Sequence, residues 1–175
     1  MTKAYIFMPD GSMPDGSMPE GLVNAKDNIV IEALKTRLGQ ISVANGYLMD
    51  LDTIEEWRVV PWSSDVLPAV DIRNEEKTID FNTIAEWYCT LPITLALAIE
   101  GEVSVADARK AGADIIYALG HDSTGAFDHT LDGNVLNVTL KGDNISVVHT
   151  EYKTTVVTVS VNLEYTTAVF DVYDR

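Results

Sequence analysis

The chain has 175 residues, of which 46% are apolar and 22% charged, and this length and composition fit one globular domain with a sizeable core. Twelve Lys and Arg residues face 27 Asp and Glu residues, so the formal net charge is −15. Because lysine and arginine drive binding to phosphate backbones and to anionic lipid surfaces, this balance argues against a nucleic-acid binder and against a membrane-surface protein.

A small tandem repeat opens the chain, in three units that read Met8-Pro-Asp-Gly-Ser, Met13-Pro-Asp-Gly-Ser and Met18-Pro-Glu-Gly. Its five-residue period fits neither a helix nor a strand, and Pro followed by Asp-Gly is turn chemistry. The simpler interpretation is a flexible, dispensable arm. The alternative is an arm that orders against a neighbouring subunit, where its methionines fill irregular apolar gaps. We assign residues 1–26 to this arm and residues 27–175 to a single folded domain.

The first predicted helix begins at Asp27 or Asn28, because either side chain can cap a helix. Asn45-Gly46 supplies a left-handed stop for it. Between these signals an apolar stripe recurs at helical spacing, formed by Val30, Leu34, Leu38 and Ile41.

Two short strands are predicted next, at Glu56–Pro61 and Leu67–Arg73, with a turn at Trp62–Asp65 between them. The early proline of the second strand suits a strand start or a sheet edge. Residues 74–82 are predicted to form a charged loop.

A long strand follows over residues 84–99, and Gly101 ends it. Its alternation is strongest after Pro92, where one face carries Ile93, Leu95, Leu97 and Ile99. Ser104 with Asp107 three residues later resembles a capping box, so a second helix begins there and has Gly120 as its C-cap. Its predicted packing face consists of Val105, Ala108, Gly112, Ile115 and Leu119.

The last third of the chain reads as a polar loop at residues 121–134, a β-hairpin and a final strand at Val156–Tyr165. The hairpin is predicted from two apolar runs, Val135–Leu140 and Ile145–His149, on either side of Lys141-Gly-Asp-Asn. These elements predict an α+β fold, with a mixed or antiparallel β-sheet, two main helices packed on it, and a β-hairpin.

The polar loop holds the best candidates for chemistry, His121 and His129 among Asp122, Asp128 and Asp132. Imidazoles and carboxylates can bind a divalent metal. However, the Asp spacing of a calcium loop and the i, i+4 histidine pair of a zinc helix are both missing, so solvated turn residues are the better interpretation. No nucleophile elbow, P-loop or dinucleotide fingerprint occurs either. We expect no catalytic residue, no cofactor and no metal.

Cys89 is the single cysteine, so no disulfide can form within the chain, and its apolar neighbours favour a small buried hydrophobe. The short apolar run before Pro9 does not suffice for a signal peptide, so we expect folding in a reducing cytoplasm. Trp57 and Trp87 lie in predicted strands and are expected in the core. Trp62, at the turn, is expected as a partly buried loop residue, and it is also a candidate interface anchor.

Four stretches carry a resemblance to a known family: the helix from Ile31 that leads to Gly46-Tyr47, the strand Leu67-Pro-Ala-Val-Asp-Ile, the strand from Leu91 with the helix Val105–Leu119 after it, and the strand Val156–Tyr165. In order and spacing they resemble the tail terminator (tail-completion, or tail-to-head joining) proteins of long-tailed bacteriophages. The resemblance covers roughly residues 28–166, and neither the N-terminal repeat nor the predicted hairpin belongs to the pattern.

This resemblance implies a virion structural protein that forms a ring, usually of six copies, on the end of the tail tube. Such a ring ends tube polymerisation and presents its other face to the head or neck. Its partners are further copies of itself, the tail tube protein and a head/neck connector protein, first in the host cytoplasm and then at the tail–neck junction. The acidic charge suits a lumen through which DNA slides without sticking. The candidate interface residues are Met13, Met18, Trp62, Asp122 and Phe127.

Two alternatives remain open at this point. A head-completion protein or another minor neck protein could share such a sandwich of helices on a sheet. More remotely, the chain could be a small cytoplasmic hydrolase whose site assembles from scattered residues. Alanine at His121 and Asp122 discriminates the hydrolase, because it should then abolish an activity.

Overall fold

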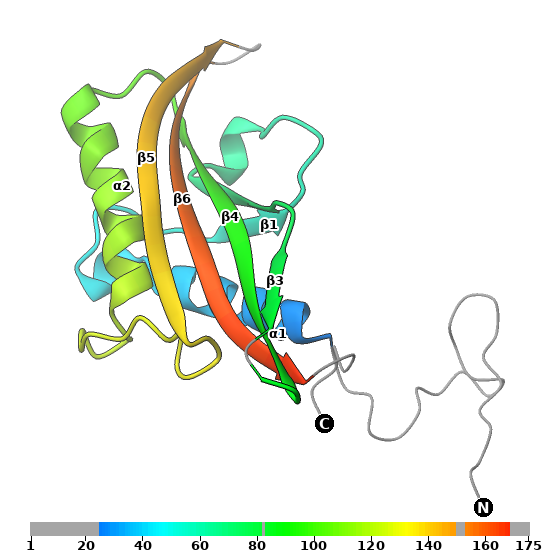
Figure 1. Cartoon of the computed structure of the whole chain (residues 1–175). Helices are drawn as coiled ribbons and strands as arrows, with labels where there is room; N and C mark the ends of the chain where they lie inside the picture. The colour runs from blue at the N-terminus through cyan, green and yellow to red at the C-terminus, as the bar shows by residue number, and fades with distance from the viewer. Residues whose placement is uncertain (1–24, 82, 150–152, 169–175) are drawn as a thin grey trace, which may run out of the picture.

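The structure, a computed structural model, describes residues 25–81, 83–149 and 153–168. Two helices, α1 (Lys26–Leu38) and α2 (Val105–Gly120), pack on one face of a mixed six-stranded sheet (Figure 1). The predicted α+β class is therefore confirmed. None of the helices in the described part of the chain is long and apolar enough to cross a membrane.

The sheet has the order β1-β2-β4-β6-β5, and β3 also pairs with β4, beside the end of β2. Only β1 and β2 run parallel to each other among these pairs, and the other neighbours are antiparallel. One edge of the sheet is therefore β5, and β1 and β3 form the opposite edge (Figure 1). The strands are β1 (Thr53–Glu56), β2 (Ala69–Asn74), β3 (Thr78–Phe81), β4 (Glu86–Glu100), β5 (Asn137–His149) and β6 (Lys153–Ala168).

The core lies between the helices and the two long central strands, which pair along the whole length of β4. The predicted alternation is confirmed, since every second residue is buried on the helix side of both strands. Ile99, at the end of β4, is half-buried. The buried residues are Cys89, Leu91, Ile93, Leu95 and Leu97 on β4, and Val157, Val159, Val161, Leu163 and Tyr165 on β6.

The predicted capping box of α2 is confirmed. The Ser104 hydroxyl accepts from the backbone N–H of Asp107 at 3.1 Å and donates to its carboxylate at 2.7 Å. Gly112 packs directly on the sheet, because a methyl group there would lie 3.1 Å from a Val157 methyl. Val105 was expected on the packing face but is exposed, since it belongs to the first turn, which extends beyond the sheet contact. Gly120 is the last residue of the helix, and His121 takes the capping position.

Helix α1 differs from the prediction at both ends. Ala25 precedes it without a side-chain cap, and Asp27 instead bonds Lys77 at 2.8 Å and accepts from the Tyr165 hydroxyl. The helix ends at Leu38, and Asn45-Gly46 closes a separate 3₁₀ turn (Val43–Asn45), with Gly46 at φ 90°. The predicted Asp27 cap is wrong because that carboxylate serves a tertiary contact.

The strand predicted at Glu56–Pro61 is also wrong. β1 ends at Glu56, and Trp57 has a left-handed φ of 51°, so the chain turns away from the sheet there. The turn is held by the Asp71 carboxylate, which accepts from the backbone N–H of Arg58 at 3.0 Å. Trp57 is exposed rather than in the core, whereas Trp87 is half-buried against it.

Two further expectations fail in the outer strands. The loop expected at residues 74–82 contains β3, whose four side chains are all exposed and therefore show no burial alternation. The hairpin expected at Lys141-Gly-Asp-Asn does not form, because β5 runs straight through these residues. A register shift between Leu140 and Gly142 absorbs Lys141 as a bulge, and pairing with β6 continues beyond it.

Candidate interaction site

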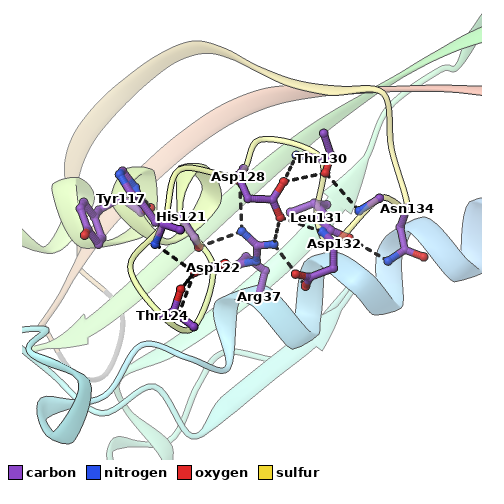
Figure 2. Close-up of polar contacts among 12 residues, drawn as sticks. Arg37, Tyr117, His121, Asp122, Thr124, Asp128, Thr130, Leu131, Asp132 and Asn134 are labelled. Carbon is purple, nitrogen blue, oxygen red and sulfur yellow. Dashed lines mark hydrogen bonds and ion pairs between the residues drawn. The ribbon is translucent and has the colours of Figure 1, made fainter.

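Arg37, near the end of α1, organises the whole 121–134 loop (Figure 2). Its side chain is buried and donates to the backbone carbonyl oxygens of His121 at 2.8 Å and Asp128 at 3.1 Å. The same guanidinium bonds the carboxylates of Asp128 at 2.5 Å and Asp132 at 3.2 Å. One cation thus joins the start, the middle and the far part of the loop to the helix layer.

The loop's carboxylates are engaged in holding its shape. Asp128 accepts from the hydroxyl of Thr130 at 2.6 Å as well as from Arg37, and these bonds hold the pKa of Asp128 well below its usual range. Asp122 accepts from the hydroxyl of Thr124 at 2.6 Å and from the backbone N–H of Ala126 at 3.0 Å, which also lowers its pKa. No group of three potential metal ligands occurs among the described residues. Asp122, expected at an interface, is thus tied into its own turn.

A row of aromatic rings runs from α2 into the loop. The rings of Tyr117 and His121 stack with centroids 3.9 Å apart, and Nδ1 of His121 lies 3.0 Å from the Tyr117 carbonyl oxygen. Phe127 meets His121 edge-on at 6.0 Å and His129 at 5.1 Å. Phe127, an expected interface residue, is 73% exposed, so the row presents ring surface to solvent.

Beneath this row lies an apolar groove of 670 Å³ between α2, β5 and the loop. This volume is in the range of about 300–1,000 Å³ typical of ligand pockets. Two histidines and Asn137 lie among its chiefly apolar and aromatic walls, and Nδ1 of His129 is buried and makes no hydrogen bond with a described residue. The groove is lined by Ala113, Ile116, Tyr117, Leu119, Gly120, His121, Phe127, His129, Asn137, Val138, Leu140 and Val161.

Exposed apolar side chains form two sets, one near the β5 edge of the sheet and one away from it. The β5-edge set surrounds the groove and consists of Tyr117, Phe127, Leu136 and Leu140. The β3-edge set lies away from the groove and has two parts. Trp57, Val59 and Val60 lie in the loop after β1, where Val59 and Val60 are beside the end of β4 and the start of β6, and Ile79, Phe81 and Ile84 lie in the β3–β4 hairpin at the start of β4. Val59 is 93% exposed and Ile84 is fully exposed, so both present nearly all of their apolar surface to solvent.

Trp62, a third expected interface residue, lies on the side of the β3-edge set and not near the groove. It is partly buried, and the Arg58 guanidinium sits 4.1 Å from the centre of its ring. Arg58 and Arg73 are in turn linked, since Arg73 donates to the Arg58 carbonyl oxygen at 2.9 Å. Trp62 therefore packs against its own loop, which presents Val59 and Val60 to solvent.

The structure brings Asp122 and Phe127 together in one loop and leaves Trp62 on the far side, while Met13 and Met18 lie outside the described residues. Sequence reasoning missed Arg37, although a signal was present, because Arg37 is three residues after Leu34 on the apolar stripe of α1. An arginine at a core position usually anchors a buried carboxylate or carbonyl group.

The groove offers chiefly apolar and aromatic contact area, with two imidazole groups at its wall. No carboxylate lines it in the described part of the chain, so neither histidine has an acidic partner within the groove. Such walls suit binding by shape and apolar contact. No protein-family model and no curated protein matches this chain.

Proposed function

We propose that this protein is a virion structural protein that caps the tail tube of a long-tailed bacteriophage, ends tube polymerisation and forms the interface to the head or neck. It acts as a closed ring, of six copies by resemblance to the tail terminator proteins. The observation that carries the proposal is the pair of exposed apolar surfaces, the β5-edge set around the groove and the β3-edge set away from it.

The two surfaces differ in composition and shape, and this difference favours one kind of self-association. The β5-edge set surrounds a groove, whereas the β3-edge set projects from a loop and a hairpin. An isologous dimer buries the same patch from both copies, but two different, complementary patches build a head-to-tail contact. When the rotation between copies closes, head-to-tail contacts form a ring.

The order of elements gives separate support. Three of the four stretches that carry the family resemblance lie in β2, in β4 with α2, and in β6, and these three strands are neighbours in the sheet. The first stretch begins in α1, but its Gly46-Tyr47 follows a separate 3₁₀ turn and does not end the helix. These elements supply the scaffold, and the surfaces at the two edges supply the contacts. Termination and joining then need complementary surfaces rather than a reactive group.

Electron microscopy of tails assembled without this protein tests the proposal directly. We expect overlong tubes without heads, because nothing stops the tube protein from polymerising. Tails of normal length that lack heads would instead indicate a joining or head-completion role. Complete virions of normal appearance would overturn both roles, and restoring the wild-type gene is the control.

A further inference from the structure

The ring contact described so far uses the exposed rim of the apolar groove, but it gives no role to the interior of the groove or to the methionine repeat at residues 8–21. The repeat offers three identical Met-Pro pairs. We propose that the groove receives the Met-Pro-Asp-Gly-Ser arm of a neighbouring copy. The assignment of the arm to a neighbouring copy, and not to the same copy, rests on the proposed ring.

The chemistry of the groove suits a methionine. Methionine is unbranched, so it fills irregular gaps, and its sulfur makes favourable contacts with aromatic rings. Tyr117, His121, Phe127 and His129 place four rings along one wall, while Leu140 and Val161 supply aliphatic surface opposite. A proline beside each methionine adds to the fit, because aromatic-lined grooves are common receptors for proline-containing segments.

Charge singles out this groove among the hollows of the molecule. The repeat carries Asp10, Asp15 and Glu20 and no basic residue, so it is an acidic ligand on a chain of net charge −15. Four other hollows among the described residues each include a carboxylate, from Asp71, from Glu32 and Glu56, from Asp122 or from Asp114. The hollow at Asp71 also has Arg58 and Arg73 in its lining, but these cations are already paired with Glu55 and Asp71. The apolar groove has none in its described lining, and its ionisable groups are imidazoles and a phenol. An acidic arm therefore meets no carboxylate in the described lining of this groove.

The proposed ring packing places the starting point of the arm next to a neighbour's groove. The ion pair of Asp27 with Lys77 fixes the start of α1 next to β3, whereas Arg37 fixes its other end to the loop beside the groove. Asp27 and Arg37 are ten residues apart on α1, which is about 15 Å within one copy, and an extended arm spans that distance. The choice between the two grooves therefore follows from the packing of the copies in the ring. When the β3 edge of one copy meets the β5 edge of the next, the start of α1 lies beside the neighbour's groove.

The repeat itself has a consequence for binding. Three units with the same Met-Pro pair allow three registers, and each register places a methionine in the groove. Loss of one methionine leaves two registers, so it should weaken binding by roughly twofold or less, whereas loss of all three should remove it.

A labelled peptide of residues 8–21 tests the groove. The receptor is the full chain with Met8, Met13 and Met18 all changed to Ser, so that its own arm does not compete. We expect the peptide to bind this receptor saturably, as measured by fluorescence anisotropy. A receptor that also carries Ala113→Phe, whose ring fills the groove, should bind the peptide with an affinity at least about tenfold lower. Ala106→Phe, the same change two turns earlier on α2 and outside the groove, should bind as before. Binding that is absent, or equal for both receptors, or equal for a triple-serine peptide, would overturn the proposal.

Disulfide trapping tests which copy supplies the arm. Cys89 is buried, so engineered cysteines at Ser12 and Leu140 are the reactive pair. Ser12→Cys and Leu140→Cys chains, mixed after separate purification, should form a covalent heterodimer under oxidation. A chain that carries both changes but links only within itself would show that the arm occupies its own groove, which overturns the neighbour assignment. Failed peptide binding with intact rings would refute this inference and leave the proposed ring standing.

Discussion

At the scale of single residues, Arg37 has the largest structural role outside the apolar core. It is fully buried, yet its charge is matched by two carboxylates and two backbone carbonyl oxygens from a loop more than eighty positions away in sequence. The loop in turn carries the aromatic row and one wall of the groove. The shape of the groove therefore depends on one guanidinium.

Replacing Arg37 by Leu should destabilise the fold by about 3–5 kcal/mol, because it leaves the Asp128 carboxylate and the loop carbonyl groups without their partner. Urea unfolding followed by circular dichroism measures the change. Arg109, exposed on α2, is the matched control, and its alanine variant should stay within about 0.5 kcal/mol of wild type. Equal stability of the Arg37 variant would show that the loop is held by other contacts.

The lowered pKa of Asp128 predicts that the stability of the fold depends on pH. Because its pKa in the folded state lies below the unfolded value of about 3.9, its ionised form stabilises the fold above that pH and the contribution is lost as the pH falls. Asp128→Asn should be less stable than wild type at pH 7, and the gap should narrow below about pH 4. The free energies of unfolding of wild type and Asp128→Asn, measured between pH 7 and pH 3, give this gap in stability. A gap that stays constant over this range would contradict the assigned role.

At the scale of elements, the predictable parts are those in which one face is buried along a regular backbone. β4, β6 and α2 were predicted because alternation and the Ser104 cap are local signals. β3 was missed because its side chains are exposed on both faces. Lys141 was placed in a turn because a bulge inside a long strand carries the same residue types as a hairpin turn.

The groove could be predicted only in part. Phe127 and Asp122 were selected from the polar loop, but the groove requires β5, α2 and the loop to converge, and no local pattern encodes this. The outward turn at Trp57 depends on the hydrogen bond from the Arg58 backbone N–H to Asp71 in β2, and no local sequence pattern predicts this contact.

The contact of α2 with the sheet gives a prediction at this scale. Alanine is favoured over glycine in helices by about 1 kcal/mol, so Gly→Ala should stabilise α2 where space allows. Gly120 has nothing near its Cβ position, whereas Gly112 would meet Val157 at 3.1 Å. Gly112→Ala should therefore be less stable than Gly120→Ala in thermal unfolding. The opposite order would mean that α2 sits further from β6 than the structure places it.

At the scale of the whole molecule, the proposed ring requires each copy to contact its two neighbours through two different surfaces. Leu140→Asp places a charge in the β5-edge set, and Ile84→Asp places a charge in the β3-edge set. Both side chains are exposed, so neither change should alter the fold by more than about 0.5 kcal/mol. Val105→Asp, at an exposed apolar site outside both sets, is the control and should assemble as wild type does.

The most direct test is the particle mass of these proteins by size-exclusion light scattering, alone and mixed, with short tail tubes added where free chains do not assemble. Each aspartate variant alone should stay monomeric. Their mixture should form dimers and stop there, because one intact β5 edge meets one intact β3 edge and the spoiled edges cannot extend the contact. A mixture that stays monomeric, or single variants that assemble like wild type, would contradict head-to-tail packing through the two edges.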